Sequence, residues 1–425
     1  MKAYKSMSKE ELEALKNELQ KQYDEMKNKG LKLDMSRGKP EFRQLDLSMG
    51  LLGVIDENSD LKAENGTDCR NYAIVDGLPE AKELMAGIMD TKSENVIVCG
   101  NASLTIMYDC VARSMIHGVC GNTPFMKQEK IKFLCPVPGY DRHFGITESF
   151  GIEMINIPMD DNGPDMDLVE KYVNNDETVK GIRCVPKYSN PGGVVYSDEV
   201  VKRFAALKPA AKDFRIYWDN AYAIHHLYDE IQIPDILTEC EKAGNPDMVL
   251  EFASTSKVSF AGAGIAAIAA SKANRDWILS TMKVQTIGYD KINQLRHVRF
   301  FKDNAGVMAQ MKKHADLIRP KFEAVLELLD KELGSLEIGT WTKPKGGYFI
   351  SFDALPGCAK EIVNMCKEAG VVMTGAGATY PYKKDPEDKN IRIAPTYPPV
   401  EELQVAAELF VLCVKLVSVK KLLAE

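Results

Sequence analysis

The sequence predicts an α/β protein with a large three-layer domain, built on a mainly parallel sheet, and a smaller α+β domain. Between residues 79 and 270, short apolar strands alternate with helical stretches, as in a parallel sheet that is covered on both faces. A long helical region over about 274–334 then leads out of this unit, and shorter strands and helices follow. We therefore expect an N-terminal helix and segment (1–50) that joins the small domain, a large domain (51–300) and a small C-terminal domain (301–425).

The first predicted element is an amphipathic helix over 8–29, in which Ser8 and Glu11 form a capping box and Gly30 marks the end. The irregular segment SRGKPEF (36–42) follows. In the large domain we expect helices over 79–90 and 103–117, and strands over 95–99, 131–135, 153–157, 181–185, 215–218, 249–252 and 264–270. In the small domain we expect strands over 347–352, 371–374 and 390–394, and helices over 357–369 and 400–424.

The composition argues against several classes of protein. The 425-residue chain has a formal net charge of −7 and no Lys/Arg block, which disfavours a nucleic-acid partner. No apolar run approaches the roughly 20 residues of a membrane span, and the charged N-terminus lacks the apolar region of a secretory signal. The ten cysteines are scattered without a CxxC pair. They indicate reduced core cysteines in a cytoplasmic protein, and no metal site.

Ligands of open α/β sheets bind beyond the carboxyl ends of the strands, so the residues that follow each strand are candidates for a site. After strand 95–99, Gly100, Asn101, Ala102 and Ser103 open a helix, where backbone N–H groups and the helix dipole suit an anion. A plain N-cap turn is the alternative. After strand 131–135 comes Tyr140, which either stacks on a planar ligand or packs under a loop.

Three further strand ends carry polar side chains. Asn190 follows strand 181–185, and Asp219 follows Ile-Tyr-Trp, where a buried carboxylate needs a cation or a donor. Lys257 lies in EFASTSKVSFAGAG, between a hydroxyl-rich run and a glycine-spaced turn. Each residue alone fits an ordinary structural role. Together, an anion cradle, an aromatic ring, an amide, a carboxylate and a lysine are the components that a pyridoxal-phosphate site requires.

With these motifs in this order, the sequence resembles the class I, fold-type I pyridoxal-phosphate aminotransferases along nearly the whole chain. More narrowly, it resembles the bacterial aspartate aminotransferases with SRGKP and STSK…AGAG motifs. The resemblance implies pyridoxal 5′-phosphate as cofactor, ping-pong transfer of the amino group of L-aspartate to 2-oxoglutarate, and a homodimer. Another amino-acid substrate, or a C–S β-lyase on the same scaffold, remains an alternative. A non-catalytic regulatory protein is disfavoured because residues 1–35 hold one helix and no helix-turn-helix.

The resemblance also implies a role for each motif residue. Lys257 is the Schiff-base lysine and proton carrier, and Asp219 bonds the ring nitrogen. Asn190 and Tyr222 bond the ring hydroxyl, and Tyr140 stacks on the ring. The resemblance also implies that Tyr72, in NYAIVDGLP, contacts the phosphate of the neighbouring subunit. Arg392, in Ile-Arg-Ile, would bind the substrate α-carboxylate, and Gly38 would let the N-terminal segment approach the substrate closely. The implied phosphate-binding residues are Asn101, Ala102, Ser103, Ser254 and Ser256.

Two positive charges are left unassigned. A dicarboxylic substrate needs a cation at its distal carboxylate, and the candidates are Arg37 or Lys39 in SRGKP and Lys291 or Arg296 in DKINQLRH. Many class I members also carry an arginine in the turn after the lysine, where it pairs with the phosphate. Residues 260–265 contain none, so another group must neutralise the phosphate.

Overall fold

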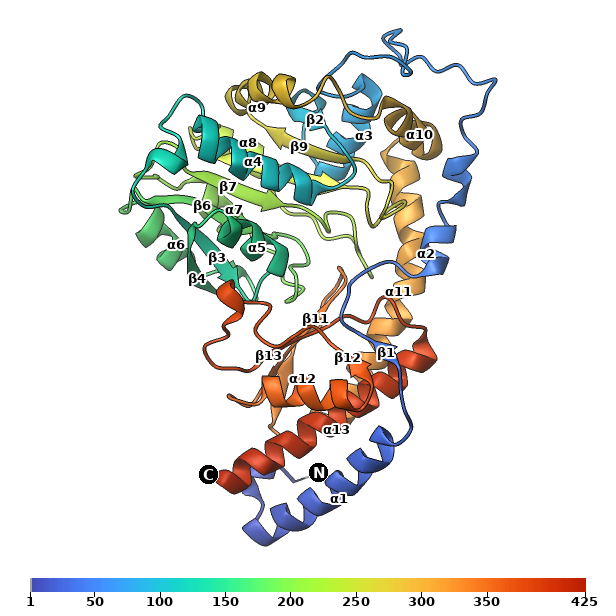
Figure 1. The fold of residues 1–425 in the computed structure, drawn as a ribbon, viewed down its shortest axis with the longest axis vertical. Coiled ribbons are helices and arrows are strands. Elements are labelled where there is room, and N and C mark those ends of the chain that lie inside the picture. The colour runs from blue at the N-terminus through green and yellow to red at the C-terminus, as the bar shows by residue number, and fades with distance from the viewer. Residues whose placement is uncertain (1) are drawn as a thin grey trace.

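The computed structural model describes residues 2–425 (Figure 1). An eight-stranded sheet forms the centre of the larger part. Its strands lie in the order β2 (Val96–Val98), β9 (Ala266–Ala270), β8 (Val249–Ser254), β7 (Arg215–Asp219), β6 (Val179–Cys184), β3 (Lys132–Val137), β4 (Glu153–Asp160) and β5 (Gly163–Pro164). The pairs from β8 to β4 are parallel, whereas β9 is antiparallel to both neighbours and β5 is antiparallel to β4. The predicted mainly parallel sheet is confirmed.

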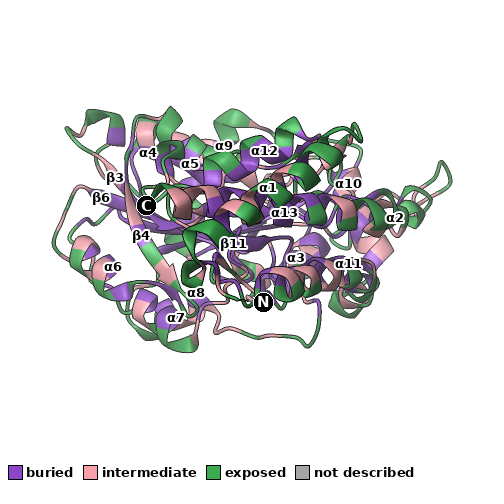
Figure 2. Cartoon of the chain, turned by 90° about the horizontal axis from the view of Figure 1, so that it is seen from below, coloured by how far each residue is buried: buried purple, intermediate pink, exposed green. Residues whose placement is uncertain are grey.

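The sheet separates two hydrophobic cores. On β7, Ile216 and Trp218 pack into one core and Tyr217 into the other, so the three central residues of the strand are apolar on both faces. The helices of the larger part are α3 (Pro79–Met89), α4 (Ser103–His117), α5 (Asp141–Ser149), α6 (Met166–Val173), α7 (Asp198–Ala205), α8 (Ile236–Lys242), α9 (Lys272–Gln285) and α10 (Lys291–Phe301). Of these, α4 and α9 cover one face, and α3, α6, α7, α8 and α10 contribute to the core on the other. The predicted three layers are present, with buried strands inside and exposed residues on the outer helix surfaces (Figure 2).

A smaller unit forms around a second sheet, in which β10 (Gly339–Trp341), β11 (Ile350–Ala354) and β13 (Asn390–Ile393) are antiparallel. Around it lie α1 (Lys9–Lys27), α2 (Phe42–Asp46), α11 (Asn304–Leu333), α12 (Ala359–Glu368), α13 (Val400–Ala424) and the parallel pair β1 (Leu33–Asp34) and β12 (Val371–Val372). Helix α1 packs along α13 although the two helices lie at opposite ends of the chain (Figure 1).

Helix α11 belongs to both hydrophobic cores. Val307 and Met311 near its start pack with the large sheet, whereas Leu329 and Leu333 near its end pack with the small one. The predicted domain boundaries at residues 50 and 300 therefore remain a prediction, because one continuous helix links the two units. Within residues 2–425, no helix is both long enough and apolar enough to cross a membrane.

Local signals account for the element boundaries. The predicted capping box is present: the Ser8 side chain accepts from the Glu11 N–H at 3.2 Å, and Glu11 Oε2 accepts from the Ser8 N–H at 2.6 Å. The predicted helical region over 274–334 consists of three helices, because Asp290 and Asp303 each cap a new helix. The strand predicted over 347–352 begins only at Ile350. Gly347 has a φ of +79° and packs on Tyr188, so the chain is not extended there.

A buried ion pair connects the N-terminal segment to α11. Lys321 Nζ is fully buried and donates to Glu41 Oε2 at 2.7 Å and to the Thr396 carbonyl at 2.8 Å. Glu41 also accepts from the half-exposed Arg43 at 2.8 Å. Because a buried ammonium is costly without a counter-charge, this pair determines where residues 36–42 lie against the small unit.

We predict that Glu41→Gln destabilises the protein by about 3 kcal/mol, because it leaves the Lys321 ammonium buried without a negative partner. The measurement is the shift of the urea unfolding midpoint. Arg43→Gln is the matched control, since it removes only the solvent-exposed partner of the same carboxylate and should cost about 1 kcal/mol or less. Equal destabilisation by the two variants would contradict the prediction.

Candidate active site

A cavity of about 370 Å³ lies where the carboxyl ends of the parallel strands face the small sheet. Its lining comes from the N-terminal segment, the start of α5, the loops after β6, β7 and β8, and the small unit: Ser36, Arg37, Gly38, Tyr140, Asp141, Arg142, Val185, Asn190, Asp219, Ala221, Tyr222, Lys257, Phe349, Thr374 and Arg392. Most of the residues predicted to bind cofactor or substrate are therefore brought together, because the carboxyl ends of parallel strands meet at one edge of a sheet.

Lys257 follows β8 and reaches into this cavity. Its Nζ lies 4.9 Å from the centre of the Tyr222 ring and 5.9 Å from the centre of the Tyr348 ring. Withdrawal from solvent lowers the pKa of the Lys257 amine, and the negative charge of Asp219 opposes this shift. The lower pKa favours the neutral amine, which is the form that acts as a nucleophile and as a base.

Asp219, at the end of β7, has a carboxylate that is only half satisfied. Its Oδ2 is 2.8 Å from Nε2 of the buried His143, whereas its buried Oδ1 has no hydrogen-bond partner among residues 2–425. Burial lowers the pKa of His143, so the neutral ring donates its Nε2 proton to Asp219. Since Asp219 lines the cavity, the free oxygen is available to a ligand that carries a proton donor.

Arg392, on β13, is oriented by contacts on several sides. Its Nη1 donates to Asp141 Oδ1 at 3.0 Å and to Asn190 Oδ1 at 3.2 Å, and its Nη2 donates to Thr374 Oγ1 at 3.1 Å. The guanidinium also lies over the Phe349 ring, 4.8 Å from its centre. A planar donor group held in this way suits a carboxylate, and Asp141 shows that an acidic group can reach it.

The predicted phosphate ligands come together at the start of α4. Ser256 Oγ donates to the Asn101 carbonyl at 3.3 Å, and Ser254 Oγ donates to Ser256 Oγ at 3.1 Å. The N-cap, Ala102, offers no side-chain cap, so the first N–H groups of α4, from Ser103 onward, stay available to an anion. Strands β2 and β8 are each antiparallel to β9, so they run in the same direction. Helix α4, which follows β2, therefore begins at the same edge of the sheet at which β8 ends.

Gly264 and Gly38 each allow a close packing contact that a side chain would prevent. A Cβ on Gly264 would lie 2.9 Å from Thr255 Oγ1 and 3.2 Å from the Ser256 nitrogen, so this glycine allows the turn to pack on the STSK segment. A Cβ on Gly38 would lie 2.3 Å from the Phe349 ring. Gly38 thus lets the N-terminal segment cover the ring that supports Arg392.

Four of the predicted cations differ in their positions. Arg37 lines the cavity, whereas the Lys39 ammonium lies 3.8 Å from the centre of the Tyr397 ring and is not part of the lining. Lys291 and Arg296 lie in α10 and do not line the cavity either. Tyr72 also lies elsewhere: it is 77% exposed, on the long segment that projects between α2 and α3 (Figure 1).

Sequence reasoning missed His143, Asp141 and Arg142. All three lie in the first turn of α5, directly after Tyr140. The signal that could have identified them is position, because the helical turn that follows Tyr140 carries the partners of both Asp219 and Arg392. Phe349 and Thr374 were missed because they belong to the small unit, and nothing in their local sequence relates them to the strand ends.

Comparisons with known proteins agree with this geometry. A model of the aspartate amino-transferase family matches residues 7–425. An aspartate aminotransferase of Corynebacterium glutamicum is 47% identical over 403 residues, which are 94% of this chain and 93% of that protein. The crystal structure of an aspartate transaminase from C. glutamicum has a TM-score of 0.96 at 45% identity and covers 99% of both chains. An α-aminoadipate aminotransferase of Thermus thermophilus, complexed with N-(5′-phosphopyridoxyl)-L-leucine, shares the fold at 18% identity, with a TM-score of 0.73 and 95% of both chains covered.

Fold and site together define the class of this protein, an aminotransferase with a three-layer α/β core and a half-buried lysine at the carboxyl edge of its sheet. The chain belongs to the aspartate amino-transferase family. The predicted resemblance to pyridoxal-phosphate aminotransferases is thereby confirmed. The narrower subgroup that was inferred from SRGKP and STSK stays a prediction.

We predict that Lys257 in the cofactor-free protein reacts with trinitrobenzenesulfonate at a lower pH than the exposed lysines do. Because the pKa of Lys257 is lowered, its neutral amine is present at pH values below the usual lysine pKa of about 10.4. The measurement is the pH dependence of modification at each lysine, read by peptide mass spectrometry. In urea-unfolded protein, where burial is lost, Lys257 should follow the other lysines. An unchanged pH dependence on unfolding would refute this assignment.

Proposed function

We propose that this protein binds pyridoxal 5′-phosphate and transfers the amino group of L-aspartate to 2-oxoglutarate, giving oxaloacetate and L-glutamate. The observation that carries the proposal is one cavity that joins the Lys257 amine, the unpaired Asp219 oxygen and the Arg392 guanidinium. The 47% identical aspartate aminotransferase of C. glutamicum supports aspartate as the donor.

The residues present fit the cofactor. The unpaired Asp219 Oδ1 would accept the proton of the ring nitrogen, and the Lys257 amine would bind the aldehyde carbon. Asn190 and Tyr222 would bond the ring hydroxyl, and Tyr140 would cover the ring face. The phosphate would lie at the start of α4, among Asn101, Ala102, Ser103, Ser254 and Ser256. When bound, the cofactor supplies an electron sink for the bonds at the substrate Cα.

The side chains of the chain then have separate tasks. Arg392 binds the substrate α-carboxylate and so fixes the direction of the Cα–H bond. Lys257, as a neutral amine, takes the proton from Cα and returns it in the opposite half-reaction. Burial raises the pKa of Tyr222 well above its usual value, so its phenol stays protonated and can donate a hydrogen bond. His143 orients Asp219 and satisfies the oxygen that the cofactor does not use.

The distal carboxylate of aspartate needs a second cation, and the cavity offers Arg37 and Arg142 in addition to Arg392. Both side chains are exposed, so they can move to meet a substrate. We assign the distal carboxylate to these two arginines. Lys39, Lys291 and Arg296 are outside the lining and are not needed for this role within one chain.

We also propose that the active enzyme is a homodimer. Tyr72 is 77% exposed and does not line the cavity of its own chain, although the family resemblance gives it a phosphate contact. The projecting segment that carries it can therefore reach the cavity of a second copy. Analytical ultracentrifugation would test this, and a monomer with full activity would rule it out.

The direct test of function is an absorbance titration of the protein reconstituted with pyridoxal 5′-phosphate. On addition of L-aspartate, the band of the aldehyde form should fall, the pyridoxamine band should rise, and oxaloacetate should appear in equal amount. Addition of 2-oxoglutarate should reverse the change and release L-glutamate. Release of pyruvate with an unchanged aldehyde band would instead indicate a lyase. Faster turnover of aromatic or branched amino acids would indicate another donor.

We predict that Arg37→Gln and Arg142→Gln each lower kcat/KM for L-aspartate and 2-oxoglutarate by about tenfold to a hundredfold, which is the loss of one charge-assisted hydrogen bond of about 1.5–3 kcal/mol. The kcat/KM for L-alanine, which lacks the distal carboxylate, should be unaffected when it is measured in the half-reaction without 2-oxoglutarate. Lys39→Gln is the matched control, because its ammonium lies over Tyr397 and outside the cavity. An equal loss for L-alanine would show that these arginines do not act on the distal carboxylate.

A further inference from the structure

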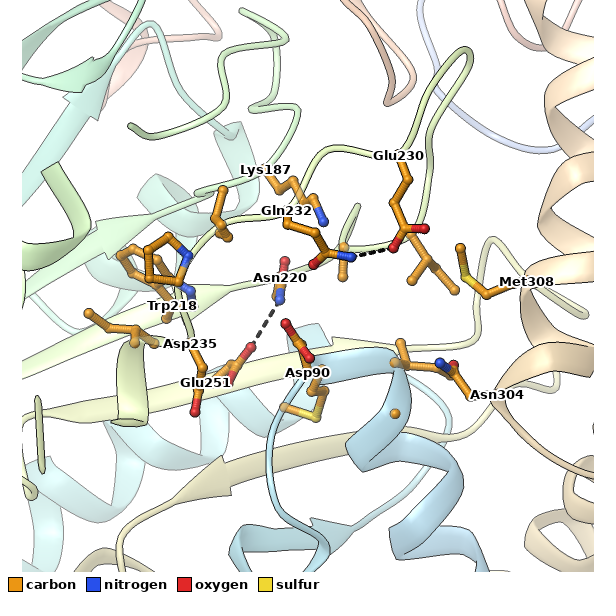
Figure 3. Close-up of a pocket in the computed structure, with 18 residues that line it drawn as sticks. Asp90, Lys187, Trp218, Asn220, Glu230, Gln232, Asp235, Glu251, Asn304 and Met308 are labelled. Carbon is orange, nitrogen blue, oxygen red and sulfur yellow. Dashed lines mark hydrogen bonds between the residues drawn. The ribbon is translucent and has the colours of Figure 1, made fainter. Parts of the chain in front are cut away.

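A second cavity lies against strands β7 and β8 (Figure 3). It is bounded by the end of α3, by Trp218 on β7, by Glu251 on β8, by residues 230–236 and by the start of α11. No lining residue is shared with the first cavity. The two cavities nevertheless adjoin, because Asp219 lines the first and the next residue, Asn220, lines the second.

Two polar groups in this second cavity are buried and only half satisfied. Asn220 is 7% exposed and Glu251 is 2% exposed, and Asn220 Nδ2 donates to Glu251 Oε1 at 2.9 Å. Asn220 Oδ1 and Glu251 Oε2 have no hydrogen-bond partner within the described chain, residues 2–425. Figure 3 shows both side chains on the cavity wall. Buried polar atoms of this kind are normally satisfied, so a polar occupant is expected.

A buried cation faces the same space. Lys187 is 6% exposed, and the negative charges of Glu230 and Asp90 act on its ammonium. In Figure 3 the Lys187 side chain lies above Asn220 and Gln232, and the Asp90 carboxylate lies below Asn220. Burial lowers the pKa of Lys187, and a bound carboxylate would offset that shift. The cavity thus offers a cation on one side and oxygen acceptors on the other.

The other acidic groups restrict what can bind. Asp235 is occupied as the N-cap of α8, where it accepts from the Leu237 and Thr238 N–H groups. Burial raises the pKa of Glu251 well above its usual range, which favours its uncharged form. Asp90 and Glu230 remain as exposed carboxylates. Over residues 2–425, no cluster of His, Cys, Asp and Glu is arranged to hold a metal ion.

The volume of the cavity and the chemistry of its walls further limit which ligands can bind. The cavity holds about 90 Å³, which at about 10–15 Å³ per water-sized position accommodates about six to nine non-hydrogen atoms. Trp218, Ile88 and Ile224 form apolar walls. The acidic groups would repel the extra carboxylate of aspartate or glutamate, so the dicarboxylic substrates are disfavoured in this cavity.

We propose that this cavity is a second binding site, which takes a small neutral α-amino acid in its zwitterionic form. The ligand carboxylate pairs with Lys187. The ligand ammonium donates to Asn220 Oδ1 and Asp90, and a side chain of alanine size meets the apolar wall. The inference depends on the second cavity alone and not on the transamination proposed above.

The test is equilibrium dialysis of radiolabelled L-alanine against the holoenzyme. Saturating succinate is present to occupy the carboxylate-binding arginines of the active site. We expect one L-alanine per chain. Arg392→Gln should leave this binding unchanged, which separates the second site from the active site. Lys187→Met and Asp90→Asn should each weaken it at least about tenfold, because each removes one of the two charges that match the zwitterion. Unlabelled L-aspartate should not displace the label.

The Asp90→Asn variant is expected to fold normally, because Asp90 is exposed and its left-handed backbone, with a φ of +55°, is tolerated by asparagine. A loss of binding in this variant therefore does not result from unfolding. Circular dichroism checks that both variants are folded. The proposal is overturned if L-alanine does not bind, if Arg392→Gln abolishes binding, or if Lys187→Met and Asp90→Asn bind L-alanine as the unmodified protein does.

Discussion

The Asp219 carboxylate, buried at the carboxyl end of β7, is the constraint on which the rest of the site depends. A charge in this position is costly, and His143 satisfies only one of its oxygens. The structure places α5 so that His143 reaches this oxygen, and the same helical turn supplies Asp141 to Arg392. The other oxygen has no partner within residues 2–425, and the negative charge of Asp219 opposes the burial that lowers the pKa of Lys257, which follows the neighbouring strand β8. One buried carboxylate thereby organises elements from both parts of the molecule.

The cavity is formed jointly by two units with separate cores, so its geometry depends on what holds them together. Helix α11 passes continuously from one core to the other. The buried Lys321–Glu41 pair anchors the N-terminal segment, and that segment carries Arg37 and Gly38 into the cavity. The cavity residues on this segment and on β13 are therefore positioned by contacts with the smaller unit, whereas Lys257 and Asp219 are positioned by the large sheet.

The alternation of side chains along a strand explains how two cavities can adjoin without sharing a residue. Asp219 and Asn220 are consecutive but line opposite cavities, and the backbone N–H of Asn220 bonds to the Phe252 carbonyl of β8 at 2.8 Å. Glu251 lies on β8 and Asn220 directly follows β7, so the polar groups of the second cavity are attached to the same two strands that position Asp219 and Lys257. The two sites differ in charge: basic side chains outnumber acidic ones in the lining of the first, whereas acidic side chains outnumber the single lysine in the lining of the second.

The sequence by itself determined the order of strands and helices and the strand ends that carry Tyr140, Asn190, Asp219 and Lys257. These features depend on short-range signals, namely apolar runs, caps and glycine-rich turns, that a few neighbouring residues encode. Only the tertiary structure decided that His143 pairs with Asp219, that Arg37 enters the cavity while Lys39 lies over Tyr397, and that Asn220 and Glu251 face a second cavity. Such pairings join side chains from distant segments, and they depend on how whole elements pack, which local periodicity does not record.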